Sequence, residues 1–180
     1  MSFRKLILGL AIVVTFQQMG GSLAAQPANF PVPSGNSNQL FFLQRTPNLN
    51  TIVCELNYKD GKVDPLNPVH VFWIRYGEKG QRQELNYIQR TFAYGIKHRK
   101  IAETQYELNF VSYKKIKMYL IFAADGKFHV YSMINKKMCI LNKIYLEIRG
   151  GTFWSPNVEY VELSGMDPAL NQPVKEKLKI

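Results

Sequence analysis

Histidines are the residues of this sequence best suited to acid–base or metal chemistry. His70 lies in Val-His-Val-Phe and His129 in Phe-His-Val-Tyr, whereas His98 lies in a basic run. An imidazole on such a strand could act as the general base of a small hydrolase or bind a metal ion. No Asp, Glu or Cys lies within two residues of His70 or His129, so the further ligands of a metal site are missing nearby. We therefore expect hydrogen-bonded structural histidines and no metal or other cofactor, and we keep the hydrolase as an alternative.

Motifs of catalysis are absent from the sequence. It has no Gly-x-Ser-x-Gly elbow, no glycine-rich phosphate loop followed by Lys-Ser or Lys-Thr, no His-Glu-x-x-His and no Cys-x-x-Cys. Catalytic triads do assemble from positions that are distant in sequence, so an enzyme is not excluded. The patterns favour a protein that does not catalyse a reaction.

The two cysteines, Cys54 and Cys139, both fall within expected strands. In an oxidising compartment they could form a disulfide if the fold brings their Cα atoms within about 7 Å. Otherwise each is a buried thiol that packs as a small apolar side chain. The sequence leaves both alternatives open and slightly favours separate thiols.

Large rings and hydrogen-bonding side chains are mixed in segments 73–76, 87–90 and 153–157. Ligand pockets combine apolar walls with a few polar groups in this way. The alternative is ordinary packing, in which Arg75 or Arg90 pairs with a carboxylate such as Glu78 or Glu84. The candidate ligand-binding residues are His70, Trp73, Arg75, Tyr87, Arg90, Trp154 and Asn157.

Alternation of apolar and polar residues predicts a series of strands that could position these side chains. Asp125-Gly126 is a two-residue hairpin signal, and the short turns around it predict an antiparallel meander. The expected strands cover residues 51–58, 69–76, 106–113, 117–123, 128–134, 138–149 and 158–163.

One segment has helical spacing instead. Between 81 and 94, the apolar residues Leu85, Ile88 and Phe92 recur at i, i+3 and i+7, and Gly95 could end a helix. The strand at 69–76 is apolar on both faces, so we expect this amphipathic helix to cover it. The predicted fold class is mainly β (α+β): an antiparallel β-meander that forms a curled sheet or open barrel with one covering amphipathic helix.

Five lysines are expected to converge at one end of this meander. Successive hairpin turns alternate between the two ends of a sheet, so the turns near 114–115 and 135–136 should share an end. Such a patch could bind an anionic surface, or it could be a solvated rim that protects the sheet from aggregation. This anion-facing patch comprises Lys114, Lys115, Lys117, Lys136 and Lys137.

The N-terminus has the composition of a secretory signal peptide over residues 1–25. Arg4 and Lys5 precede an apolar run from 6 to 16, and small residues follow. The run is shorter than the roughly 20 residues that span a bilayer, so we expect cleavage and a mature chain without a transmembrane segment. Residues 26–38, which are rich in Pro, Ser, Asn and Gly, are expected to form a flexible linker, and 39–180 a single β-rich domain.

The net charge of +10 favours anionic partners. An exported protein does not meet nucleic acid, so we expect an anionic component of the cell envelope or a small lipid-like ligand. The sequence does not determine the oligomeric state.

Three segments, 67–76, 87–95 and 150–160, contain Pro-Val-His-Val-Phe-Trp-Ile-Arg-Tyr, Ile-Gln-Arg-Thr-Phe-Ala-Tyr-Gly and Gly-Gly-Thr-Phe-Trp-Ser-Pro-Asn. In these segments the chain resembles an uncharacterised family of bacterial exported proteins, the domain of unknown function DUF4833. The resemblance covers roughly residues 43–180 and implies a bacterial envelope or secreted protein. It implies no activity, ligand or site residue, and the two cysteines are not part of its pattern.

These observations predict a periplasmic or secreted protein, and first of all a non-catalytic binding module for a lipid-like or anionic ligand. The second hypothesis is a structural or interaction protein of the envelope that uses a sheet edge or an exposed apolar face. The third is the small hydrolase, with His70 or His129 as its base.

Overall fold

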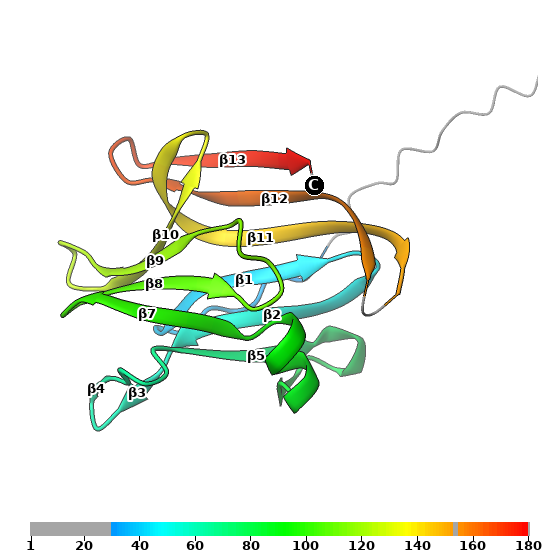
Figure 1. Cartoon of the computed structure of the whole chain (residues 1–180), viewed down its shortest axis with the longest axis horizontal. Coiled ribbons are helices and arrows are strands. Elements are labelled where there is room, and N and C mark those ends of the chain that lie inside the picture. The colour runs from blue at the N-terminus through cyan, green and yellow to red at the C-terminus, as the bar shows by residue number, and fades with distance from the viewer. Residues whose placement is uncertain (1–29, 153–154, 180) are drawn as a thin grey trace, which may run out of the picture.

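The computed structural model describes residues 30–152 and 155–179, and these are almost entirely β-structure (Figure 1). The expected signal peptide and Trp154 lie outside the described residues. Two short helical turns are present, η1 (Tyr76–Glu78) and η2 (Gln89–Ala93). The strands are β1 (Gln39–Arg45), β2 (Asn48–Leu56), β3 (Tyr58–Lys59), β4 (Lys62–Val63), β5 (Val69–Arg75), β6 (Gln81–Glu84), β7 (Ile96–Ala102), β8 (Gln105–Phe110), β9 (Met118–Phe122), β10 (Phe128–Ile134), β11 (Lys137–Gly151), β12 (Pro156–Asp167) and β13 (Gln172–Lys179).

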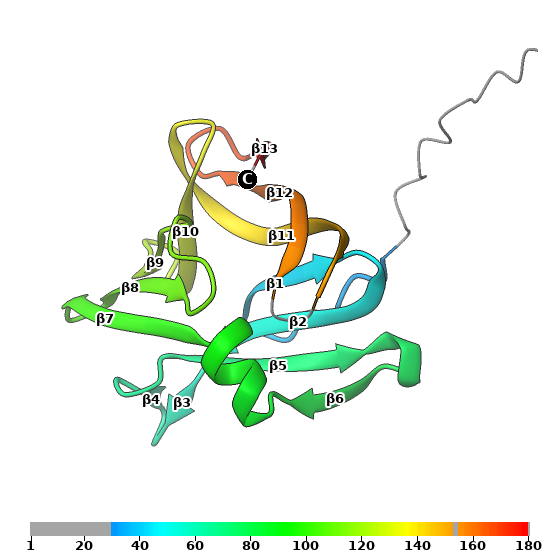
Figure 2. The ribbon, with the colours of Figure 1, turned by 45° about the vertical axis from the view of Figure 1, so that its right-hand side comes forward.

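The long strand β11 joins two wings of one curled sheet. Along one of its edges, residues 137–140 pair with β10 and residues 143–146 pair with β1, while β12 and then β13 follow on its other edge. The β1–β11 pairing is parallel, and the other described pairings are antiparallel. The strand order β6-β5-β2-β1-β11-β10-β9-β8-β7 curls into a half-barrel (Figure 2). The predicted curled sheet is confirmed.

The core lies on the inner side of this curl. Alternate residues of each strand point inward, as the two-residue period of a strand requires. Phe41 of β1 contacts Phe110 of β8 edge to face at 6.2 Å between ring centroids, although three strands separate β1 from β8 in the sheet. The curl therefore closes the two wings over one shared apolar core.

The amphipathic helix predicted over 81–94 is wrong. Residues 81–84 form β6, which pairs with β5, and only the short π-helical turn η2 follows. Of the three apolar residues that suggested the helix, only Leu85 is buried. The outer face of β5 is covered by residues of the sheet itself. Phe72 packs with Phe42 and Val53, and the Cζ atom of Arg82 lies 3.6 Å from the centroid of the Phe72 ring. The cationic side chain of Arg82 thus covers the face of β5 that the predicted helix was expected to cover.

Besides β6 and the two-residue strands β3 and β4, the sequence analysis did not predict β1, β7 and β13. The strands β7 and β13 lie at edges of the sheet and are rich in lysine and arginine, so their composition is that of exposed segments. Charged edge strands of this kind resist pairing with other chains. The strands of the expected meander are present as β8 to β11.

Both cysteines are free thiols in the core. Cys54 lies on β2 and Cys139 on β11, and neither is exposed to solvent. Burial raises the pKa of both thiols, so they are protonated at neutral pH. The structure therefore has the arrangement of separate buried thiols and not the disulfide.

Part of the expected linker packs on the sheet. The side-chain amide of Gln44 donates to the carbonyl of Pro31 at 2.8 Å, and Asn36 donates to Glu55 at 2.9 Å. Among the described residues, no helix has the length and hydropathy needed to cross a bilayer.

Candidate functional site

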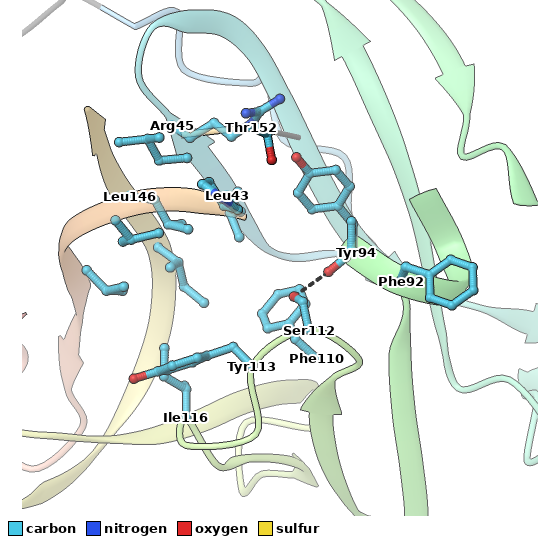
Figure 3. Close-up of a pocket in the computed structure, with 16 residues that line it drawn as sticks. Leu43, Arg45, Phe92, Tyr94, Phe110, Ser112, Tyr113, Ile116, Leu146 and Thr152 are labelled. Atoms are coloured by element: carbon cyan, nitrogen blue, oxygen red, sulfur yellow. Dashed lines mark hydrogen bonds between the residues drawn. The ribbon is translucent and has the colours of Figure 1, made fainter. Parts of the chain in front are cut away.

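An apolar cavity of about 360 Å³ lies inside the curl, between β1, β11, β12 and the end of β8 (Figure 3). This volume falls within the range of small-molecule pockets, roughly 300–1,000 Å³. Its apolar wall includes Leu43, Phe110, Ile116, Ile144, Leu146 and Val161.

Strand geometry explains how these residues come to share one cavity. Leu43 and Arg45 are two residues apart on β1, and Ile144, Leu146 and Ile148 are two apart on β11, so each set faces inward. The parallel pairing of β1 with β11 brings the two sets side by side. The cavity thus depends on a parallel pairing between distant segments, which local sequence signals do not predict.

Besides Thr152 and residues of β12, two irregular segments contribute to the wall. The first is η2 with the following Tyr94, and the second is the loop 111–117 between β8 and β9. Ser112 of the loop donates a hydrogen bond to the carbonyl oxygen of Ala93 at 2.5 Å, which joins the segments (Figure 3). The cavity wall is therefore continuous at this point.

Arg45 is the unusual group of the cavity. Its Nε atom is buried without a hydrogen-bond partner among the described residues, and the guanidinium forms no ion pair with a described carboxylate. Its Cζ atom lies 5.9 Å from the ring centroid of Tyr94. Buried polar groups are nearly always hydrogen-bonded, so a buried Nε without a partner among the described residues calls for an explanation.

Tyr94 adds a second polar group at the same end of the cavity, where Figure 3 places its hydroxyl near Arg45. Burial raises the pKa of Tyr94, although the charge of Arg45 opposes this effect. The hydroxyl is therefore protonated at neutral pH and can donate a hydrogen bond. Together the two side chains form a donor pair that suits an anion.

The lining residues do not form a catalytic pair. Hydroxyls are present at Ser112 and Thr152, but the described lining contains no His, Asp, Glu or Cys. A hydroxyl nucleophile needs an adjacent base to be activated. The described lining therefore offers no base for either hydroxyl.

His70 lies elsewhere, in a polar cluster on the outer face of the sheet. Its Nδ1 is 3.1 Å from Glu55 and its Nε2 is 2.7 Å from Glu84, while Arg82 donates to Glu55 at 2.7 Å. Desolvation raises the pKa of Glu55, but hydrogen bonds from Asn36, His70 and Arg82 outweigh it and hold that pKa below its usual value. Both ring nitrogens of His70 thus face charged side chains and not a nucleophile.

His129 is also hydrogen-bonded, to Asp125 at 2.7 Å. This bond lowers the pKa of Asp125. No group of three or more His, Cys, Asp or Glu residues within 30–152 and 155–179 is arranged to hold a metal ion.

The other sequence-derived candidates are spread over the surface and core, and none of those described lines the cavity. Trp73 is buried and donates to Gln89 at 3.3 Å, and its ring meets Tyr94 edge to face at 5.1 Å. Arg75 pairs with Glu78, as the alternative reading expected. Arg90 donates to the carbonyl of Leu85, and Asn157 donates to the carbonyl of Arg149. Tyr87 is exposed. Ligand binding by these residues stays a prediction.

The five lysines of the expected anion-facing patch lie at one end of the meander. The hydroxyl of Ser132 donates to the carbonyl of Lys117 at 3.0 Å, so the loop 111–117 adjoins the end of β10 and the turn at 135–136. Lys137 pairs with Asp167 at 3.5 Å. All five lysines are exposed, and anion binding by the patch stays a prediction.

Comparison with protein families adds one finding. The model of the domain of unknown function DUF4833 matches residues 41–177. The chain belongs to this family. The DUF4833 match confirms the expected resemblance and runs from β1 into β13, so it includes the described cavity wall. No curated protein matches the chain, and no solved structure matches it.

Sequence reasoning missed Arg45. The signal was present, because Phe41, Leu43 and Arg45 alternate on one strand face, and an arginine that continues an apolar face is unusual. Tyr94 and Ser112 carried no such signal, since they reach the cavity through irregular segments.

Proposed function

We propose that this DUF4833 chain is a non-catalytic binding module for a lipid-like molecule with an anionic head group. The observation that carries the proposal is Arg45, a partly buried guanidinium whose buried Nε has no hydrogen-bond partner among the described residues, in a cavity that is otherwise mostly apolar. A carboxylate or phosphate monoester would satisfy its donors in the two-pronged geometry that guanidinium groups favour.

Cavity size limits the ligand. A volume of about 360 Å³ is near the lower end of the range for ligand pockets, so it suits a single acyl or prenyl-like chain rather than a two-chain phospholipid. Burial of each methylene contributes roughly 0.8 kcal/mol, which makes the chain the main source of affinity. The head group then supplies specificity through Arg45 and Tyr94.

We further propose that binding takes place outside the cytoplasm, in the periplasm or after secretion. The support is the sequence alone: two basic residues, a short apolar run and small residues at the N-terminus. An envelope contains abundant lipid-like anions, which agrees with the chemistry of the cavity.

Titration of purified protein with dodecanoate, followed by calorimetry, tests the proposal. We expect saturable binding of one dodecanoate per chain and at least about tenfold weaker binding of the cationic dodecyltrimethylammonium, because Arg45 repels it. Leu146→Trp places a larger side chain in the cavity and should abolish binding. The matched control is Leu170→Trp, since Leu170 is 59% exposed and outside the cavity.

Two results would count against the proposal. One is the absence of saturable dodecanoate binding by the unmodified protein. The other is equal binding by the Leu146→Trp and Leu170→Trp proteins when both are folded by circular dichroism.

A further inference from the structure

The segment 87–92, which leads into η2, presents large apolar side chains to solvent beside the cavity. Tyr87 is 76% exposed, Ile88 43% and Phe92 55%, all within six residues. Phe92 also reaches the cavity lining, together with the next two residues, Ala93 and Tyr94. We call residues 87–92 the apolar turn. Its outer surface faces water while the adjoining residues form the cavity wall.

The apolar turn is held firmly in place. The amide of Tyr94 donates to the carbonyl of Gln89 at 2.8 Å, which is an i→i+5 bond. The side chains of Asn86 and Gln89 each accept a hydrogen bond from the other residue's backbone amide, at 2.8 and 3.1 Å. Gly95 follows, where an added Cβ would lie 1.9 Å from the carbonyl oxygen of Arg90.

The fixed conformation of the apolar turn keeps its apolar side chains exposed. A loose segment could turn its apolar side chains inward, but a fixed one keeps them in water, which is unfavourable by roughly 25 cal/mol per Å² of apolar surface. Short π-helical turns of this kind occur often at functional sites. The exposed face is therefore a feature that the fold maintains.

Lysines flank the apolar turn on the neighbouring segment. The loop 111–117 contributes Tyr113 and Ile116 to the cavity and carries the exposed Lys114 and Lys115. Neither lysine forms an ion pair with a described carboxylate. Because Ser112 bonds to Ala93 at 2.5 Å, the loop and the turn are adjacent.

We propose that the apolar turn and the lysine-bearing loop dock together on an anionic lipid bilayer. Tyr87 and Ile88 would enter the interface between head groups and acyl chains, where tyrosine is favoured, and Lys114 and Lys115 would contact anionic head groups. The proposal rests on the proposed function, since docking there lets an acyl chain pass from the bilayer to the cavity with little exposure to water. Without Arg4 and Lys5 of the expected signal peptide, the net charge of +10 becomes +8, which is complementary to such a surface.

Co-sedimentation with vesicles tests this surface. The protein is mixed with vesicles of phosphatidylcholine alone or with phosphatidylglycerol, and we expect it to pellet with the anionic vesicles. Tyr87→Ser/Ile88→Ser should weaken the partition constant at least about tenfold, because two apolar side chains no longer insert. Lys114→Gln/Lys115→Gln should weaken it about twentyfold on anionic vesicles, since each lysine near the surface contributes to attraction.

Matched controls lie at the other end of the sheet. Lys59→Gln/Lys62→Gln removes two exposed lysines of the β3–β4 hairpin, and Leu66→Ser removes an exposed apolar residue. Both variants should pellet as the unmodified protein does. All variants should bind dodecanoate unchanged in buffer without vesicles, because none of these residues lines the cavity.

The outcomes separate the two proposals. Equal pelleting of the Tyr87→Ser/Ile88→Ser protein and the unmodified protein would overturn the docking proposal while dodecanoate binding stands. Failure of the unmodified protein to pellet with anionic vesicles would also overturn it. So would a dimer of the unmodified protein in gel filtration that the Tyr87→Ser/Ile88→Ser protein does not form, because the surface would then bind a second copy of the chain. Failure of the proposed function appears separately, as absent dodecanoate binding without vesicles.

Discussion

Arg45→Met should raise or preserve stability while it weakens ligand binding. Methionine has a similar length but no donor, so the variant removes a buried Nε that lacks a partner among the described residues. An unsatisfied buried donor costs about 1–3 kcal/mol, whereas the contact with the Tyr94 ring contributes about 0.5–1 kcal/mol. Because the guanidinium is only partly buried, we expect the free energy of unfolding to rise by about 1 kcal/mol or to stay unchanged.

Binding should change in the opposite direction. A hydrogen bond from a charged donor to a carboxylate contributes about 1.5–3 kcal/mol, which corresponds to a 10- to 100-fold loss of dodecanoate affinity in Arg45→Met. Affinity for uncharged dodecanol should be unaffected, since its chain meets the same apolar wall. Arg45→Lys retains the charge without the planar fork and should bind dodecanoate with intermediate affinity.

The assay combines two measurements on the same preparations: urea unfolding for stability and calorimetry for binding. Arg75→Met serves as control because Arg75 pairs with Glu78 outside the cavity, so it should leave the dodecanoate affinity unchanged. If Arg45→Met lowers the free energy of unfolding by more than 1 kcal/mol and binds dodecanoate as tightly as before, Arg45 is a structural residue and the reasoning is refuted.

Two further predictions concern stability. Gly95→Ala should lower the free energy of unfolding by at least about 2 kcal/mol, because its Cβ would meet the backbone oxygen of Arg90 at 1.9 Å. Gly77→Ala, where the nearest atom is 3.7 Å away, is the control in urea unfolding, and equal effects would contradict the steric argument. The pKa of Glu55 lies below its usual value, so the stability it contributes is present above its unfolded pKa of about 4.3 and is lost as pH falls through the folded pKa. Glu55→Gln should therefore flatten the decline of stability below about pH 5, and an identical slope for both proteins would count against the cluster around His70.

Sequence patterns predicted local structure well where a strand is half buried and its turns are short. The strand at 128–134 is β10 with the same limits, and Asp125-Gly126 lies in the turn before it, where Gly126 has a positive φ of 76°. The helix prediction failed because Leu85, Ile88 and Phe92 have helical spacing without sharing a buried face: Leu85 enters the core, whereas Ile88 and Phe92 are largely exposed. Periodicity alone does not distinguish a buried stripe from an exposed one.

The sequence by itself determined that the chain is mainly β-structure, which residues share a strand face, and its membership of the DUF4833 family. Only the tertiary structure decided that β1 pairs with β11 in parallel and that Arg45, Tyr94 and Ser112 meet at one cavity. The physical reason is the separation along the chain between the residues that determine each feature. Which face a residue takes follows from a two-residue period along the chain, whereas which strands pair depends on the burial of apolar surface between segments about a hundred residues apart.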